Sequence, residues 1–215
     1  SGIRHSVTGA DYASVRGGAF MGHRIIAPPG GYLANVTPAE WESRFHDRVP
    51  ERMTGAAFLA EYGGFTDTVT TIDPARTYAI RQPTAHPIYE HDRVQRFRAL
   101  LQARPPDDDT LAQLGDLMYQ SHESYSACGL GSSGTDALVA LVREAGPAQG
   151  LFGAKITGGG SGGTVAVLAR KGSRAAIDEV ATRYERATGR AAAVIAGSSD
   201  GAMRFRAPSP LTFLP

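Results

Sequence analysis

Two segments with strand character flank a glycine-rich loop in the stretch Gly153-Ala-Lys-Ile-Thr-Gly-Gly-Gly-Ser-Gly-Gly-Thr-Val-Ala-Val-Leu-Ala169. Five of the six residues from 158 to 163 are glycine. Glycine tolerates positive φ, so such a loop can turn several backbone N–H groups toward one anion, which suits phosphate binding. A flexible hairpin turn has the same composition. The stretch alone leaves both interpretations open, and either one predicts a strand-loop-strand unit.

Two nucleotide-binding patterns do not fit this loop. Gly158, Gly160 and Gly163 have the G-x-G-x-x-G spacing, but a dinucleotide fingerprint runs from a strand into a helix. The residues that follow, Thr164-Val-Ala-Val-Leu168, form a β-branched run typical of a strand. A Walker-type loop fails as well, because Lys155 precedes the glycines. If an anion binds here, we expect the loop backbone to hold it.

Helical patterns surround the strand-loop-strand unit. Leu138, Leu141, Val142 and Ala145 have the i, i+3, i+4, i+7 spacing of one buried helix face. Further strands are expected at Ala192–Ala196 and at 203–207, so the order predicts an α+β fold with helices against one face of an antiparallel sheet. Other helices are predicted at 11–22, at 38–45 after a Thr37 cap, at 56–62 after a Thr54 cap, from a first turn at Pro87 to Leu101, around 111–118 and from a Ser173 cap to Gly189, with a solvated connection at 105–109.

The composition describes an ordinary globular chain. Its 215 residues are 42% hydrophobic, and the formal net charge is only +1 with the basic residues scattered, so neither a nucleic-acid nor a membrane partner is favoured. Cys128 is the only cysteine, and the apolar runs are far shorter than the ~20 residues needed to span a bilayer. We expect a soluble, cytoplasmic protein.

A second candidate anion loop, Gly129-Leu-Gly-Ser-Ser-Gly134, leads into the helix that begins near Thr135. The N–H groups of a helix N-terminus favour negative charge. The alternative is a turn in which the glycines end one helix and Ser or Thr caps the next, and this is the favoured interpretation.

No metal site and no reactive cysteine are predicted. His86, Glu90 and His91 are close in sequence and His122-Glu123 adds a second pair, but neither a His-Glu-x-x-His pattern nor a cysteine cluster occurs. Surface and capping roles fit these residues better. A lone cysteine such as Cys128 is more often buried and inert than nucleophilic.

Several motifs together resemble the C-terminal part of GHMP-type sugar kinases, the superfamily of galactokinase, homoserine kinase, mevalonate kinase and phosphomevalonate kinase. The stretch 153–164 resembles the third motif of that family, a glycine-rich loop beside the nucleotide phosphates. Leu114-Gly-Asp-Leu-Met-Tyr-Gln-Ser-His-Glu-Ser-Tyr125 is similar to a galactokinase helix, and 4–16 resembles the segment after the catalytic base. A further likeness, to the kinase part of plant-type L-arabinokinases, runs through 9–12, 67–70, 83–90, 128–131 and 197–199.

The resemblance implies a ferredoxin-like GHMP C-terminal domain with extra helices, in which residues 1–30 form the tail of an N-terminal domain and residues 31–215 the C-terminal domain. It implies transfer of the γ-phosphoryl group of ATP, with Mg²⁺, to the anomeric hydroxyl of a monosaccharide such as L-arabinose or galactose. Arg4 is then the candidate catalytic residue and Tyr12 the candidate sugar-binding residue. The candidate phosphate-binding residues are Gly158, Gly159, Gly160, Ser161, Gly162 and Gly163.

The ATP loop, the sugar motif and the catalytic aspartate of complete family members have no match in this sequence. We therefore expect the chain to act together with an N-terminal kinase half, which would supply the catalytic base and most Mg²⁺ contacts, and to be inactive alone. The alternative is a non-catalytic module that binds a nucleotide or sugar, or a stable fragment.

Overall fold

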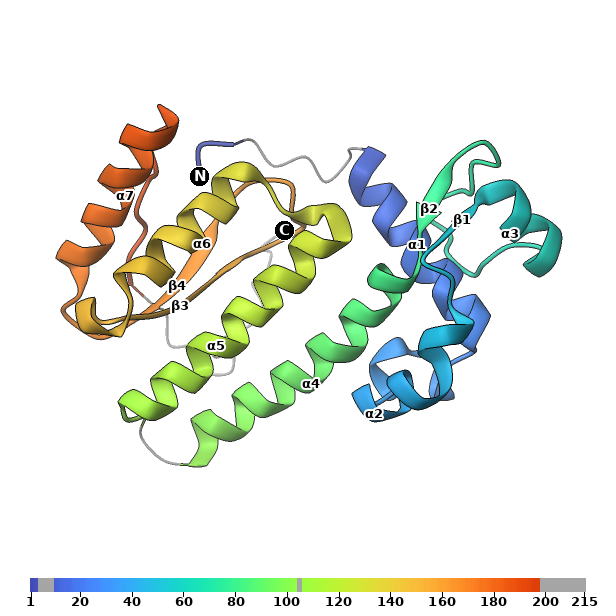
Figure 1. Ribbon diagram of the computed structural model, residues 1–215, viewed down its shortest axis with the longest axis horizontal. Coiled ribbons are helices and arrows are strands. Elements are labelled where there is room, and N and C mark those ends of the chain that lie inside the picture. Colours follow the sequence, from blue (N-terminus) through green and yellow to red (C-terminus); the bar gives the residue numbers. More distant parts are fainter. Residues whose placement is uncertain (4–9, 104–105, 198–215) are drawn as a thin grey trace, which may run out of the picture.

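One long helix, α4 (Arg81–Ala103), joins two lobes of the chain (Figure 1). The computed structural model describes residues 1–3, 10–103 and 106–197. The first lobe contains α1 (Ala10–Ile26), α2 (Pro38–Glu40), β1 (Arg52–Thr54), α3 (Gly55–Tyr62) and β2 (Thr77–Ala79). The second lobe contains α5 (Asp108–Tyr125), α6 (Ser133–Ala145), β3 (Leu151–Ile156), β4 (Val165–Ala169) and α7 (Arg174–Thr188).

The first lobe is built around large buried side chains. Trp41, Phe45 and Phe58 share one core cluster with Met21 of α1 and Ile88 of α4. The strands β1 and β2 pair antiparallel beside it. Because the first turns of α4 belong to this core, the helix is anchored in the first lobe before it extends toward the second.

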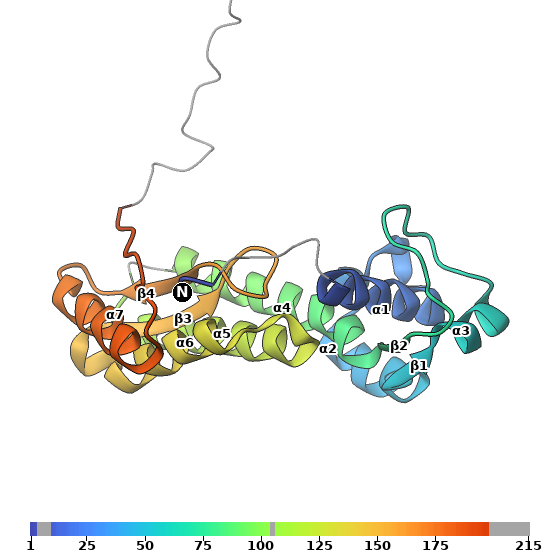
Figure 2. The ribbon, with the colours of Figure 1, turned by 90° about the horizontal axis from the view of Figure 1, so that it is seen from above.

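The second lobe is a β-hairpin covered by helices. The strands β3 and β4 pair antiparallel, and α5 and α6 pack against β3, with α7 against α6 (Figure 2). A Cβ on Gly115 of α5 would lie 1.9 Å from the carbonyl oxygen of Phe152, and one on Gly153 would lie 2.4 Å from the Cα of Gly115. The two glycines therefore let the backbones of α5 and β3 approach more closely than any side chain permits.

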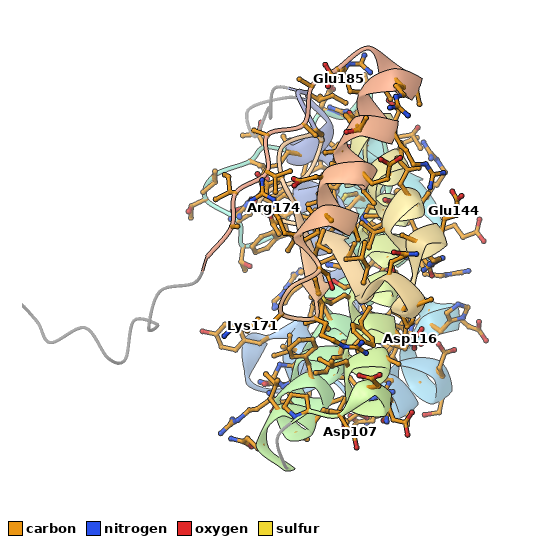
Figure 3. The ribbon with its side chains drawn as sticks, turned by 90° about the vertical axis from the view of Figure 1, so that its left-hand side faces the viewer. Asp107, Asp116, Glu144, Lys171, Arg174 and Glu185 are labelled. Atoms are coloured by element: carbon orange, nitrogen blue, oxygen red, sulfur yellow. The ribbon has the colours of Figure 1, made fainter. Side chains whose placement is uncertain are left out.

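The outward surface of the second lobe is charged. Glu144 on α6 and Arg174 and Glu185 on α7 lie along this face (Figure 3). Arg183 donates to both carboxylate oxygens of Glu144 at 2.8 Å, which links α7 to α6. These helices thus have one face on the core and the other in solvent, as an amphipathic pattern predicts.

Most predicted elements are confirmed. The chain is α+β, the glycine loop lies between two strands, and helices occupy the predicted segments. Thr37 forms a capping box with Glu40, the Thr54 side chain caps α3, and Gly189 ends α7 in a left-handed conformation. Ser173 stands at the N-cap position of α7, but its side chain makes no capping hydrogen bond.

Three details of the prediction are wrong. Pro87 lies inside α4 and not in its first turn, because the helix already begins at Arg81 and Pro83 occupies that turn. Asp108 and Asp109 are not loop: Asp107 caps α5 by accepting the Thr110 N–H, so the last two aspartates of the run form the first turn of the helix. Residues 192–196 form no strand, and the pair β1 and β2 was not predicted. The expected segment at 203–207 lies outside the described residues.

None of the helices in the described part of the chain combines the length and the apolar character that crossing a bilayer requires.

Candidate functional site

The glycine loop adopts a conformation that other residues disfavour. Positive φ angles occur at Gly158 (75°), Gly160 (84°), Ser161 (58°), Gly162 (127°) and Gly163 (88°). L-residues with a Cβ rarely enter this region, so the glycine content follows directly from the path of the backbone. The loop backbone therefore follows a path that suits glycine.

The two glycine-containing loops are joined to each other. The Ser161 N–H donates to the carbonyl oxygen of Leu130 at 2.7 Å, and a Cβ on Gly160 would lie 2.5 Å from that same oxygen. On the other side of the loop, the Gly163 N–H donates to the carbonyl oxygen of Ile3 at 3.1 Å. The amides of Ser161 and Gly163 are thus engaged within the chain.

The second loop is a turn between helices, as the favoured interpretation predicted. Gly129 has a φ of 84°, and Ser132 caps α6 through a reciprocal pair of hydrogen bonds with Thr135. The hydroxyl of Ser132 accepts the Thr135 N–H at 3.2 Å. Within the described residues this loop supports the glycine loop through Leu130.

A cavity of about 230 Å³ lies beside the start of the glycine loop. It is bounded by α4, by the end of α5 and by the end of β3. The residues that line it are His86, Glu90, Ser121, Tyr125, Lys155, Ile156, Thr157 and Gly158. Three elements that are distant in sequence thus bring polar and titratable groups to one small space.

Glu90 is the centre of the polar network in this cavity. Its Oε1 accepts hydrogen bonds from the Ser121 hydroxyl at 2.6 Å and from Lys155 Nζ at 3.1 Å, while its Oε2 accepts from Arg93 Nε at 2.8 Å. Burial raises the pKa of Glu90, but the Ser121 hydrogen bond and the two cations outweigh it and hold the pKa at about 2. Glu90 is therefore a fixed anion that positions Lys155.

Two aromatic side chains complete the cavity wall. His86 Nδ1 lies 2.8 Å from the Ser124 hydroxyl, and its ring centroid is 5.2 Å from that of Tyr125. Burial lowers the pKa of His86, although Glu90 opposes the shift. The Tyr125 hydroxyl donates to the carbonyl oxygen of Gly158 at 3.1 Å, so this side chain connects α5 to the first residue of the loop.

A buried histidine supports the loop from behind. The Nδ1 atom of His122 accepts the Ile156 N–H at 3.3 Å, and its Nε2 lies 3.1 Å from Asp136 Oδ1. The first contact requires a lone pair on Nδ1, so the proton resides on Nε2, where it is donated to Asp136. Burial lowers the pKa of His122, which agrees with a neutral ring. His122 thus ties α5, α6 and the end of β3 together.

Tyr12, the predicted sugar-binding residue, lies close to this site. Burial raises the pKa of Tyr125, and the neighbouring Tyr12 raises it further. Arg16, one turn farther along α1, is held by Asp67 through two hydrogen bonds of 2.8 and 2.9 Å. The helix α1 also contacts the segment Ser126–Leu130 that follows α5.

The other predicted residues are distributed differently. The candidate catalytic Arg4 lies outside the described residues. Cys128 is buried, and burial raises the pKa of its thiol to about 12, which fits the expected inert role. In the described ranges 1–3, 10–103 and 106–197, no three His, Cys, Asp or Glu side chains gather in a way that would hold a metal ion.

Sequence reasoning did not select His86, Glu90, Tyr125 or Lys155 as site residues. All four lie in stretches that carried the family resemblance, yet they come from three separate elements. Only the packing of α4 against α5 and β3 brings them together. No local sequence signal identifies these four residues as one site.

The cavity combines a positive charge with an open stretch of loop backbone. Lys155 supplies a positive charge in the same space as Gly158, and a Cβ on Gly158 would meet no atom within 4 Å, so the loop is open there. Backbone amides of glycine in left-handed conformations are typical anion ligands.

Comparisons with known proteins identify relatives of this chain. The family described as GHMP kinases C terminal matches residues 98–190. The chain is 44% identical to an L-arabinokinase of Arabidopsis thaliana, over 95% of this chain and 24% of the relative. It is 28% identical to a galactokinase of Thermosipho africanus, over 54% of this chain and 33% of that relative. The matched part therefore spans about a quarter of the length of the first relative and about a third of the second. We identify residues 98–190 as a GHMP kinase C-terminal domain, in a chain that is homologous to L-arabinokinase and galactokinase.

Proposed function

We propose that this chain supplies the C-terminal part of the active site of an ATP-dependent sugar 1-kinase, which phosphorylates a monosaccharide such as L-arabinose or galactose. The observation that carries the proposal is the cavity in which Lys155, Tyr125 and the glycine loop meet, with Tyr12 beside it. The homology to two sugar kinases supports the same class of reaction. The proposal includes the cytoplasmic location that we expect from the composition.

The proposed roles follow from the chemistry of each group. When bound with Mg²⁺, ATP supplies the phosphoryl group. Phosphoryl transfer depends on alignment and on neutralising charge on the phosphate oxygens. Residues Gly158 to Gly163 lie along the phosphates, with the Gly158 end nearest, since Ser161 and Gly163 already donate their amides within the chain. Lys155, held by Glu90, adds a positive charge at that end.

The remaining roles concern the sugar and the transferred group. Tyr12 packs an apolar ring on the sugar while its hydroxyl remains available for hydrogen bonds. Arg4 stabilises the transferred phosphoryl group or orients the base. The proposal assigns the catalytic base and most Mg²⁺ contacts to an N-terminal kinase half, which acts as the partner of this chain. It also keeps residues 1–30 as the tail of that half and 31–215 as the C-terminal domain.

The experiment is sugar-dependent ADP release by this chain combined with its N-terminal kinase half. We expect release with the combination and little or none with the chain alone. Tyr12→Ala should raise the KM for sugar at least tenfold and leave the KM for ATP unchanged, whereas Lys155→Met should act on the ATP side. Val69→Ala, an exposed position in the first lobe, serves as the matched control.

A result of full activity in both variants, in a complex shown to be folded, would contradict these roles. Binding of nucleotide or sugar without any ADP release, for every pentose and hexose tried, would instead favour the non-catalytic module.

A further inference from the structure

A second and larger cavity, of about 500 Å³, begins at the same Glu90–Lys155 pair. It runs along α4 and α5 from Glu90 toward Leu101 and Gln102, away from the glycine loop. At 1.5 Å per residue, the distance from Glu90 to Leu101 along the helix axis is about 16 Å. We call this space the α4–α5 groove. Its volume falls within the range of small-molecule sites, roughly 300–1,000 Å³.

The walls of the α4–α5 groove are mainly apolar. Val94, Phe97 and Leu101 come from α4, and Leu117 and Met118 come from α5. Val94 and Leu101 are each 52% exposed, which places them among the few large apolar side chains in the described residues that lie open to solvent. Val94, Phe97 and Leu101 are spaced three and then four residues apart, so they form one continuous stripe along α4.

The polar end of the groove is cationic. Arg93 and Lys155 line it, against the single carboxylate of Glu90, and Arg98 lies farther along α4. Arg93 is only 8% exposed, and its Nη2 atom is buried without a hydrogen-bond partner among the residues that the structure describes. A buried N–H without an acceptor costs roughly 1–3 kcal/mol, and more when the group is charged.

We infer that the α4–α5 groove binds an amphipathic anion, which has one unbranched apolar chain and a single carboxylate or phosphate head. The chain lies along the stripe of Val94, Phe97 and Leu101, and the head lies at the Arg93 and Lys155 end. The apolar stripe explains the chain, because its burial removes exposed apolar area from water. Arg93 and Lys155 outnumber the Glu90 carboxylate at that end, and this excess of positive charge explains the anionic head.

This site is distinct from the proposed phosphate site, although the two share Glu90, Ser121 and Lys155. Binding in the groove does not require that the chain act as a kinase. The experiment below therefore measures binding alone, and its outcome is independent of the proposed function.

The test is calorimetric titration of the full chain with decanoate and with decyl phosphate, both below their micelle-forming concentrations. We expect each to saturate one site, at least tenfold more tightly than 1-decanol, with no binding of decyltrimethylammonium. Acetate and inorganic phosphate, which have the head without the chain, should not bind at the same concentrations. The preferred head is given by the ratio of the two anionic affinities.

Variants separate the two parts of the site. Val94→Glu and Leu101→Glu place a carboxylate in the stripe on an exposed helix face and should weaken both anions at least tenfold. Val69→Glu, at an exposed apolar position of the first lobe, should change nothing. Arg93→Met should reduce the affinity for decanoate to that of 1-decanol. If Arg93→Met fails to fold, Val94→Glu and Leu101→Glu alone test whether the groove binds the anions.

Equal affinity for the anions and for 1-decanol would overturn the inference, as would binding that Val94→Glu leaves unchanged. A dimer detected by sedimentation and dispersed by Val94→Glu would assign the groove to a second copy of the chain and would overturn it as well.

Discussion

Ser161 and Leu130 are joined by a backbone hydrogen bond of 2.7 Å, although 30 intervening residues separate them in sequence. The bond links the glycine loop after β3 to the turn between α5 and α6. The shape of the loop therefore depends on a neighbour that sequence motifs treat as a separate candidate site. The first prediction tests that dependence.

Two glycines of the loop should respond differently to the same substitution. In Gly160→Ala the new Cβ would lie 2.5 Å from the Leu130 oxygen and 2.9 Å from Tyr125 Cε1, at a φ of 84°. In Gly158→Ala the φ is 75°, but no atom lies within 4 Å of the Cβ. We expect Gly158→Ala to cost about 1–2 kcal/mol from backbone strain alone and Gly160→Ala to cost clearly more.

Urea unfolding at neutral pH measures both changes in the free energy of unfolding. Equal destabilisation by the two alanines would show that the contact with Leu130 does not constrain the loop.

Glu90 should give the chain a distinct response to acid. Its pKa of about 2 lies below the ordinary value of 4.5, so the ionised side chain stabilises the fold above pH 4.5, and this contribution is lost as the pH falls toward 2. Glu90→Gln should lower the free energy of unfolding at pH 7 by on the order of 2 kcal/mol, after allowance for solvent screening. The same substitution should also make the free energy of unfolding less dependent on pH below pH 4.5.

Glu123→Gln is the matched control, because Glu123 pairs with Arg143 at the exposed surface. This change should cost less than about 1 kcal/mol. Urea midpoints between pH 3 and 7 provide the measurement. If the urea midpoint of Glu90→Gln falls with acid as steeply as that of the unchanged chain, Glu90 is not a fixed anion.

The contact between Gly115 and Gly153 should tolerate no methyl group. A Cβ on Gly115 would lie 1.9 Å from the Phe152 oxygen, so Gly115→Ala must push α5 away from β3. We expect a loss of about 3 kcal/mol or more, because both partners at the contact are backbone atoms. Gln113→Ala on the exposed face of the same helix should change the stability by less than about 0.5 kcal/mol. Thermal unfolding measures both variants. Tm values for Gly115→Ala and Gln113→Ala that differ by less than about 2 °C would contradict the close approach of α5 and β3.

Arg16 and Asp67 should be strongly coupled. Two hydrogen bonds join them, Asp67 is almost fully buried, and the Arg16 guanidinium holds the pKa of that carboxyl well below its usual range. A double-mutant cycle with Arg16→Gln and Asp67→Asn should give a coupling energy of about 1–3 kcal/mol. The exposed pair Arg183 and Glu144 should give less than about 1 kcal/mol in the same experiment. Similar coupling energies in the two cycles would mean that burial adds nothing to the Arg16 pair.

Local sequence signals predicted the elements of the second lobe well. The glycine loop, the face of α6 and the end of α7 at Gly189 all depend on short-range rules of periodicity and capping. Pro87 shows where such rules fail. A proline normally indicates a helix start, and only the anchoring of α4 in the first core, through Ile80 and Ile88, makes an interior proline tolerable.

The candidate site was predicted only in part. The loop itself was found, since its composition is unusual. Glu90 and Lys155 were not, because their pairing depends on a separation of 65 residues that no local pattern encodes. Arg93 was missed for a related reason: a charged residue on a helix predicts a solvated face, and only packing buries it.

The interior proline of α4 has a mechanical consequence. Residue 87 has no N–H to donate to the carbonyl of Pro83, so the helix lacks one rung of its hydrogen-bond ladder near the point where it leaves the first core. A helix that lacks a backbone hydrogen bond bends more easily at that point than elsewhere. His86 and Glu90 lie on either side of that position, so a bend of α4 at Pro87 would change the spacing of the groups that line the cavity beside the glycine loop.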